Sequence, residues 1–198
     1  MYPQLVPLIF FSVAAAFTPG PNNIIGSYSG FNFGIKKSLP LILGVTFGYT
    51  TLITLSAGGL GVIFNAYPLL KTVIKIIGSL FLIYLAYKIS FQNQIQKKTI
   101  KNPVKFFDTF IFQFINPKGV FAAITSISLF VELGDSYMFQ SMIVITVSFF
   151  CAVSSITSWC LLGKFLRRFI ENKKFIQRFN YTMSISLIVC VILIYLKI

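Results

Sequence analysis

The hexapeptide Thr18-Pro19-Gly20-Pro21-Asn22-Asn23 interrupts a long apolar run near the N-terminus. Between Leu5 and Ile25 the only other polar side chain is that of Ser12. Each proline removes an amide donor, and its ring clashes with the carbonyl one turn back, so a helix breaks here. Irregular backbone that faces lipid leaves polar groups unpaired, so such a break persists only where it is buried in protein or lines a cavity. This stretch is therefore the first candidate for a functional site.

The composition of the chain is that of a membrane protein. Its 198 residues are 56% hydrophobic and only 11% charged, against roughly 25% charged residues in a soluble domain. Several apolar runs reach the ~18–20 residues that cross a bilayer. We therefore expect an all-α, polytopic integral membrane protein with no separate soluble domain.

Six apolar runs predict six transmembrane helices. The predicted spans are 3–31, 39–64, 68–91, 104–131, 138–162 and 179–196. The first span is broken near Pro19, and the fourth is broken at Asn116-Pro117-Lys118-Gly119. A polar linker, 92–103, divides this single membrane domain into two halves, 1–91 and 104–198, and a basic linker, 163–178, precedes the last span.

Lysine and arginine gather on one side of the predicted membrane. The loops after the first, third and fifth spans hold most of the 17 basic residues, namely Lys36, Lys37, Lys88, Lys97, Lys98, Lys101, Lys105, Lys164, Arg167, Arg168, Lys173, Lys174 and Arg178. The loop between the fourth and fifth spans carries Glu132 and Asp135 instead. By the positive-inside rule the basic loops are cytoplasmic, which predicts that both termini lie on the opposite side of the membrane.

Each predicted half of the chain opens with a broken span. Because each half has three spans, the first and fourth cross the membrane in opposite senses, which is the arrangement of an inverted repeat. Paired broken helices of this kind are the best pointer in a sequence to a binding site near the bilayer midplane. Two unrelated proline kinks are the alternative, since proline is commoner in membrane helices than in soluble ones.

Two Gly-x-x-x-Gly pairs, Gly30 with Gly34 and Gly44 with Gly48, permit close approach of helix backbones. Small residues at this spacing are typical of packed membrane helices. We expect them to pack helices within the monomer, and a homodimer is the alternative.

The two breaks have electrostatic properties that suit an amino acid. Pro21 fits the first position of a new half-helix, where its missing N–H costs nothing, and Lys118 begins the second half of the fourth span. The start of each half-helix presents N–H groups and a partial positive charge, which suit a carboxylate. The carbonyls that end the preceding half-helices suit an ammonium group.

Lys118 is the most costly of the candidate residues to bury. A lysine near the centre of a span costs roughly 2.5–3.5 kcal/mol on insertion scales, so it should face a cavity or a partner. Contact with a substrate carboxylate and capping of carbonyls freed by the first break are the two interpretations. The predicted substrate-binding residues are Thr18, Pro19, Gly20, Pro21, Asn22, Asn23, Gln113, Asn116, Pro117 and Lys118. The amide side chains among them either contact substrate or satisfy the broken backbone.

Asp108 is the only acidic residue within a predicted span. It precedes Lys118 by ten residues, about 15 Å along a helix, which is too far for direct pairing within that span. Asp108 is a candidate to carry a coupling proton or to hold a substrate ammonium group. The alternative is a solvated neighbour of Lys105 or Lys101 near the cytoplasmic end of the span.

The residue inventory excludes most catalytic and metal chemistry. The chain has no histidine, which removes imidazole ligands and histidine general bases. Cys151, Cys160 and Cys190 lie inside apolar runs without a C-x-x-C spacing, which is typical of small buried hydrophobic residues. We expect no enzyme activity, no cofactor and no resident metal. The net charge of +13 belongs to membrane loops and not to a nucleic-acid-binding domain.

Three motifs give the chain a family resemblance. Thr18-Pro19-Gly20-Pro21-Asn22-Asn23, Tyr84-Leu85-Ala86-Tyr87-Lys88 at the end of the third span, and Asn116-Pro117-Lys118 in the fourth resemble the LysE-type amino-acid exporters over essentially the whole length. Phe112-Gln113-Phe114-Ile115-Asn116 is most similar to the branch that exports cysteine and O-acetylserine. The resemblance implies a multi-pass exporter of the bacterial inner membrane, driven by the proton motive force. Asp108 departs from it, because many relatives carry a basic residue there.

These observations predict a secondary exporter, a proton antiporter of small neutral or polar amino acids such as cysteine, O-acetylserine, homoserine or threonine. Its partners are the amino-acid substrate and the lipid bilayer, and it works by alternating access around the two breaks. A metal-cation exporter of a related fold is the alternative. It fits the residues poorly, because hard cations need clustered carboxylates and soft ones need histidine or cysteine near the site.

Overall fold

The computed structural model describes residues 4–60, 68–90, 103–132, 134–167 and 173–195. Within these ranges the chain is helical apart from short breaks, and the described residues contain no strand. The predicted linker, 92–103, lies almost entirely outside the described residues, as does the predicted end of the second span, 61–64.

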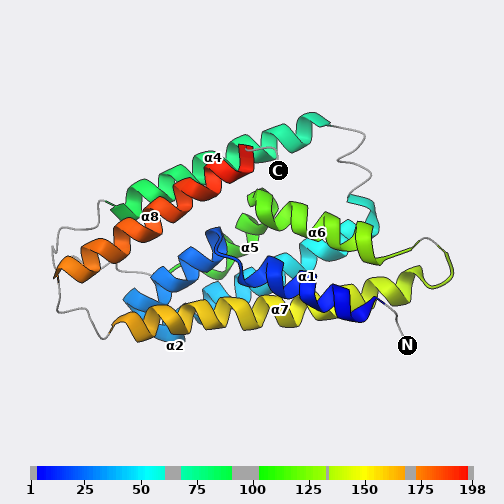
Figure 1. Ribbon diagram of the computed structural model, residues 1–198, viewed down its shortest axis with the longest axis horizontal. Helices are drawn as coiled ribbons and strands as arrows, with labels where there is room; N and C mark the ends of the chain where they lie inside the picture. Colours follow the sequence, from blue (N-terminus) through cyan, green and yellow to red (C-terminus); the bar gives the residue numbers. More distant parts are fainter. Residues whose placement is uncertain (1–3, 61–67, 91–102, 133, 168–172, 196–198) are drawn as a thin grey trace.

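The helices form an elongated bundle in which α4 and α8 lie side by side along one flank (Figure 1). The hydroxyl of Ser184 in α8 donates a 2.7 Å hydrogen bond to the carbonyl of Ala86 in α4. The described elements are α1 (Leu5–Phe17), α2 (Pro21–Leu55), the π-helical turn η1 (Ser56–Leu60), α4 (Pro68–Ser90), α5 (Phe106–Ile115), α6 (Pro117–Phe130), α7 (Tyr137–Leu166) and α8 (Lys173–Tyr195).

Helix α2 contains a reversal of direction at Gly34, which has φ 73° and ψ 174°. Ser29 and Ser38 would lie about 13 Å apart along a straight helix, yet their hydroxyl oxygens are 2.7 Å apart. The chain therefore folds back at Gly34 into a first arm, 21–33, and a second arm, 35–55. A positive φ is accessible to glycine without a steric penalty, so a single residue replaces the loop that we expected at 32–38.

Most predicted span limits agree with helix ends, and one linker differs. Helices α4, α5 with α6, and α7 end within a few residues of the predicted spans 68–91, 104–131 and 138–162. The predicted basic linker, 163–178, was wrong at both of its ends, because α7 continues to Leu166 and α8 begins at Lys173. Lysine and arginine are good helix formers, so these helices extend past their apolar segments.

Glycines bring three helices into backbone contact. A Cβ added at Gly30 would lie 1.9 Å from the carbonyl oxygen of Cys160, and one at Gly163 would lie 1.9 Å from that of Ser27, so the first arm and α7 touch along their backbones. A Cβ at Gly44 would lie 2.3 Å from the carbonyl oxygen of Phe106, and one at Gly48 would lie 2.7 Å from that of Phe110, so the second arm also packs closely on α5. The expectation of packing within the monomer is confirmed for Gly30, Gly44 and Gly48, whereas Gly34 forms the reversal.

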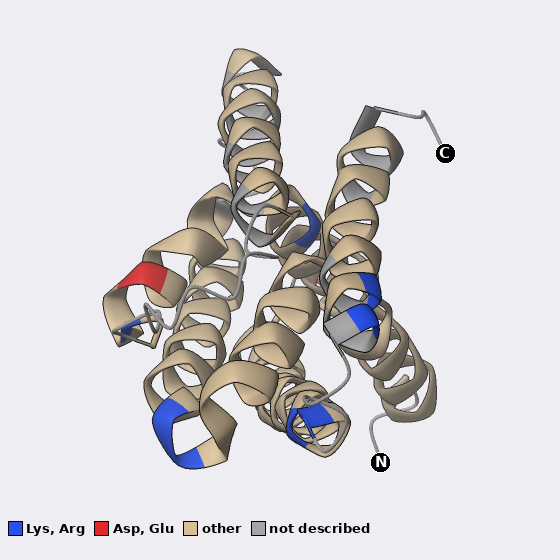
Figure 2. Cartoon of the chain, turned by 90° about the vertical axis from the view of Figure 1, so that its left-hand side faces the viewer, with Lys and Arg blue, Asp and Glu red and all other residues tan. Residues whose placement is uncertain are grey.

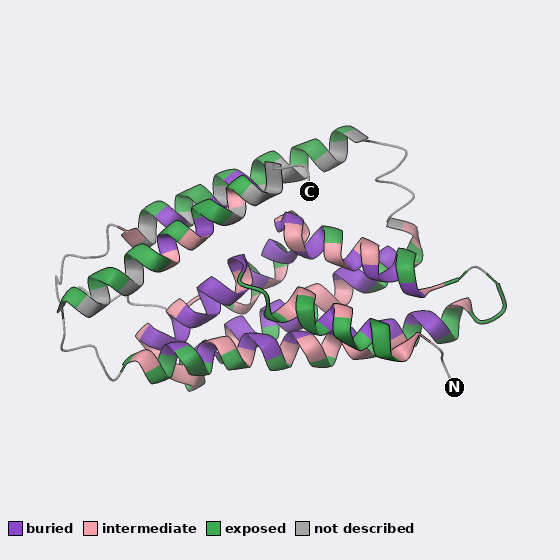
Figure 3. Cartoon of the chain, in the orientation of Figure 1, coloured by how far each residue is buried: buried purple, intermediate pink, exposed green. Residues whose placement is uncertain are grey.

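The bundle has an apolar core and also carries many exposed apolar residues. Phe10 at 73% and Leu69 at 75% exposure face outward, and serine, asparagine and glutamine side chains are buried among the apolar core residues. Figure 3 marks the buried and exposed residues along the helices. Among the described residues, Pro21–Gly59 and Tyr137–Leu166 are long and apolar enough to cross a membrane, and α5 with α6 makes a third span if the bent pair is counted as one. An outward apolar surface of this kind suits lipid.

Basic residues gather at one end of the long axis of the bundle. The exposed basic residues lie at the end where α2 reverses, α5 begins and α7 ends, which Figure 2 faces; they are Lys36, Lys37, Lys105, Lys164, Arg167, Lys174 and Arg178. The exposed acidic residues Glu132 and Asp135 lie at the opposite end, between α6 and α7, whereas Asp108 lies at the basic end, in the first turn of α5. This separation matches the charge asymmetry in the sequence.

Candidate functional site

The first break lies between α1 and α2. Helix α1 ends at Phe17, and the next helix begins at Pro21 after three intervening residues, of which Gly20 has an extended conformation (φ −165°, ψ 178°). Proline at the first helical position has no N–H to leave unsatisfied. The prolines thus end one helix and start the next.

The second break, between α5 and α6, has the same construction. Helix α5 ends at Ile115, Asn116 is extended (φ −79°, ψ 103°), and Pro117 begins α6. The two helices meet at a bend of 65°. Each break therefore consists of an extended residue followed by a proline, Gly20-Pro21 in one and Asn116-Pro117 in the other.

Two side-chain bridges hold the breaks together, although the breaks are nearly one hundred residues apart in the chain. Lys118 Nζ donates a 2.7 Å hydrogen bond to the carbonyl oxygen of Thr18. Asn22 Nδ2 donates to Gln113 Oε1 at 2.8 Å, and Gln113 Nε2 donates back to Asn22 Oδ1 at 3.1 Å. Asn22 and Lys118 both occupy the second position of their helices. The same helical position in each half thus reaches across to the other half.

Gly20 provides the space for one of these bridges. A Cβ at this position would lie 2.9 Å from both Cδ and Nζ of Lys118. Contacts under 3 Å are not tolerated by real side chains, so a larger residue at Gly20 would displace the lysine. The glycine therefore leaves room for the end of the flexible lysine side chain, and its own φ is one that any residue adopts.

The carbonyls at the end of α1 are largely satisfied by protein groups. Asn23 Nδ2 donates to the carbonyl oxygens of Ala16 at 2.8 Å and of Thr18 at 3.0 Å, and Ser155 Oγ donates to Ala16 at 2.7 Å. Lys118 Nζ also donates a hydrogen bond to the carbonyl oxygen of Thr18. We expected these carbonyls to hold a substrate ammonium group, but here the ammonium of Lys118 and the amide of Asn23 occupy that role.

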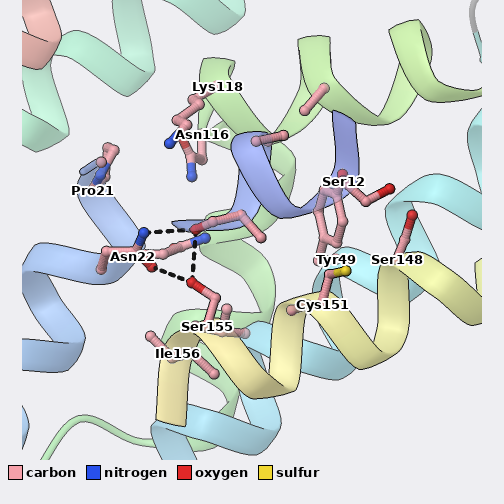
Figure 4. A pocket seen from close by; sticks show the side chains of 18 residues that line it. Ser12, Pro21, Asn22, Tyr49, Asn116, Lys118, Ser148, Cys151, Ser155 and Ile156 are labelled. Atoms are coloured by element: carbon pink, nitrogen blue, oxygen red, sulfur yellow. Dashed lines mark hydrogen bonds between the residues drawn. The ribbon is translucent and has the colours of Figure 1, made fainter. Parts of the chain in front are cut away.

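A cavity of about 70 Å³ lies where the two breaks meet (Figure 4). A single water needs roughly 10–15 Å³, so this space admits a small solute. The lining residues come from α1, the first break, α2, the second break, α6 and α7; they are Ser12, Ala15, Ala16, Gly20, Pro21, Asn22, Asn23, Val45, Tyr49, Asn116, Lys118, Gly119, Ala122, Ser148, Cys151, Ala152, Ser155 and Ile156.

The predicted residues divide between the wall of this cavity and its support. Gly20, Pro21, Asn22, Asn23, Asn116 and Lys118 line it. Gln113 is fully buried behind the wall, where Nε2 also donates to the carbonyl of Thr109 at 2.8 Å. Thr18 and Pro19 are exposed, Pro117 is buried, and none of the three lines the cavity. The hydroxyl of Thr18 bonds to the carbonyl of Ala14.

Two buried polar atoms on the cavity wall have no hydrogen-bond partner among the described residues. They are Asn116 Oδ1, on a residue that is 2% exposed, and Ser12 Oγ, on a residue that is 6% exposed. An unsatisfied buried polar group costs about 1–3 kcal/mol. Both atoms therefore favour a polar occupant of the cavity.

Five polar or polarisable wall residues were missed as site residues by the sequence reasoning. They are Ser12, Tyr49, Ser148, Cys151 and Ser155, which come from α1, the second arm of α2 and α7. Isolated hydroxyls and thiols in apolar spans resemble ordinary packing residues. Only the fold brings them to the two breaks, so no local signal distinguished them.

Asp108 lies away from the cavity, in the first turn of α5. It is exposed, and Oδ2 accepts a 3.2 Å hydrogen bond from the backbone N–H of Lys105. A carboxylate in the first turn of a helix is stabilised by the helix dipole. Asp108 therefore forms a helix cap in this structure, close to the solvated alternative considered above.

The described part of the chain offers no cluster of metal ligands. No group of three or more His, Cys, Asp or Glu residues is found there. Among the described residues that line the cavity, none is acidic, and Lys118 carries the only formal charge.

Comparison with known proteins agrees with these features. The model of the LysE type translocator family matches residues 13–197. The chain is 26% identical over 199 residues to the cysteine/O-acetylserine efflux protein of Salmonella typhi, covering 98% of this chain and 100% of the relative. It is 23% identical over 196 residues to the protein of the same name in Escherichia coli (strain K12), with the same coverage.

No solved structure matches the chain significantly. The family match covers both breaks, all of the cavity wall except Ser12, and every described helix from α2 to α8. With its apolar outer surface and family match, the protein is a multi-pass membrane protein. The chain belongs to the LysE family of translocators.

Proposed function

We propose that this protein is a secondary exporter of small neutral or polar amino acids, which bind where the two helix breaks meet. The observation that carries the proposal is the shared cavity, lined by the first residues of α2 and of α6 together with Lys118. The curated relatives are named as cysteine/O-acetylserine efflux proteins, and we extend that substrate class to this chain.

The carboxylate of the substrate binds at the paired helix starts. The first N–H groups of a helix have no intrahelical partner, and the helix dipole adds a partial positive charge there. Asn22 and Asn23 begin one helix and Lys118 and Gly119 begin the other, and all four line the cavity. Two positive helix ends and an ammonium group thus act on the same space, which favours an anion.

The absence of acidic residues from the described cavity wall separates zwitterions from cations. A divalent cation or a cationic amino acid would enter a positively charged site without a counter-charge, which is unfavourable at low dielectric. A zwitterion brings its own carboxylate to the helix starts, and Asn116 Oδ1 is an unpartnered acceptor for its ammonium group. This argument favours the amino-acid exporter over the cation exporter.

The six-span inverted repeat is part of the same proposal. The reversal at Gly34 divides α2 into the end of the first span and the whole second span. The first span consists of α1 and the first arm, and it packs against α7. The fourth span consists of α5 and α6, and it packs against the second arm, while α4 packs against α8. Each broken helix therefore packs on the second helix of the other half, as a pseudo-two-fold axis requires.

The direction of transport rests on topology and resemblance. The basic end of the bundle faces the cytoplasm by the positive-inside rule, which puts both termini outside it. We propose alternating access around the cavity in a bacterial inner membrane, driven by the proton motive force as the family resemblance implies. Asp108 lies toward the cytoplasmic end in this orientation, about 12 Å along the helix from the second break at Asn116.

Transport into inside-out membrane vesicles tests the proposal. Vesicles from cells that overproduce the chain should accumulate labelled O-acetylserine or cysteine when energised, and vesicles without the protein should not. Divalent cations and lysine should not be accumulated. Accumulation of a divalent cation without that of any amino acid would overturn the proposal and favour the cation exporter.

A further inference from the structure

The cavity has two chemically different sides. In Figure 4, Asn116, Lys118, Pro21 and Asn22 lie on one side, where the helices begin, with Ser155 beside Asn22, and other polar side chains lie on the second side. That second side is formed by Ser12, Tyr49, Ser148 and Cys151 from three different helices. The first side suits the carboxylate and ammonium groups that every amino acid has, so discrimination between amino acids falls to the second.

Ser12 is unusual among the hydroxyls of this chain. Several serine and threonine side chains in the helices donate to the carbonyl four residues earlier, including those of Thr50, Ser56 and Ser126. Ser12 Oγ makes no hydrogen bond to a described residue, although it is buried and lies on the cavity wall. Thr46, Ser79 and Ser141 share this lack of a partner but do not line the cavity.

We infer that Ser12 is a specificity-determining residue, which hydrogen-bonds the polar side chain of the transported amino acid. The inference rests on the proposed function. It assigns the second side of the cavity as a subsite for side chains that carry a hydroxyl, thiol or ester oxygen close to the α-carbon.

Ser12 differs from another wall hydroxyl, that of Ser155, which donates to the carbonyl of Ala16. Ser12 therefore offers a donor and an acceptor that nothing described in the protein uses. A site built to bond a polar group disfavours an analogue that lacks it, because its own buried group is then left unpaired.

The test compares two amino acids of nearly equal shape, serine and 2-aminobutyrate, which differ by a hydroxyl in place of a methyl group. Efflux of both is measured for the parent and for Ser12→Ala. The parent should prefer serine, and Ser12→Ala should lower that preference roughly three- to tenfold, as expected for the loss of one neutral hydrogen bond. An unchanged preference, or an equal loss of both substrates, would overturn the inference.

Ser141→Ala is the matched control, since Ser141 is also buried and unpartnered among the described residues but does not line the cavity. It should leave the preference unchanged, and an equal shift in this variant would also count against the role of Ser12. Thermal stabilisation of the purified protein by each amino acid separates the two proposals. If neither amino acid nor any other stabilises the parent, the proposed function fails; if both stabilise it equally, only the subsite fails.

Discussion

Replacement of Lys118 by methionine tests the central electrostatic feature of the cavity. The substitution keeps a long apolar side chain but removes the ammonium group that donates to the carbonyl of Thr18 at 2.7 Å. It leaves that carbonyl its second partner, Asn23 Nδ2, at 3.0 Å. The effect of the change therefore falls mainly on charge in the cavity, and much less on the folding of the break.

The expected effects on stability and on transport differ in size. Loss of a hydrogen bond to a charged group costs about 1.5–3 kcal/mol, while removal of a lysine from a span recovers about 2.5–3.5 kcal/mol. These contributions nearly cancel, so the variant should insert and melt like the parent. If Lys118 binds the substrate carboxylate, the lost 1.5–3 kcal/mol appears in transport as a decrease of roughly 10- to 150-fold.

The assay is efflux of a labelled amino acid, with thermal melting of the purified protein measured in parallel. Lys164→Met, an exposed basic residue in the last turn of α7, is the control for loss of one positive charge. Efflux by Lys118→Met within about twofold of the parent would refute the carboxylate contact. Lys118 would then act only as a cap for the carbonyl freed by the first break.

Three further substitutions test the packing, the bridges and the coupling. Gly30→Ala puts a Cβ 1.9 Å from a carbonyl oxygen of α7 and should lower the free energy of unfolding by about 1–3 kcal/mol or more, measured by thermal melting. Gly58→Ala is the control, because Gly58 has open space around it and the substitution should not lower the stability. Equal melting of both variants would contradict the close packing. Asn22→Ala and Gln113→Ala should be coupled by roughly 0.5–3 kcal/mol in a double-mutant cycle of stability, and additive effects would show that their amide pair is not formed. Asp108→Asn should leave the pH profile of efflux unchanged, because Asp108 is exposed and caps α5; a shifted profile would return it to the list of coupling groups.

Local chemistry in the sequence predicted the positions of both breaks. Pro21 and Pro117 cannot continue a helix, and each fits the first position of a new one, so the helix starts follow from these residues wherever they lie in the fold. The limits of α4 and the start of α7 likewise follow from the lengths of apolar runs. The reversal at Gly34 could not be predicted from the sequence, because glycine permits a positive φ without requiring it.

The tertiary structure decided what the breaks do together. The sequence left open whether Lys118 contacts substrate or caps the first break. In the structure its ammonium group donates to the carbonyl of Thr18, and the residue also lines the cavity. Both roles are therefore compatible with its position. Ser12, Tyr49 and Cys151 became wall residues only because α1, α2 and α7 pack around that point. Local sequence fixes where backbone hydrogen bonds must stop, whereas the partners that replace them come from distant segments and depend on how helices pack.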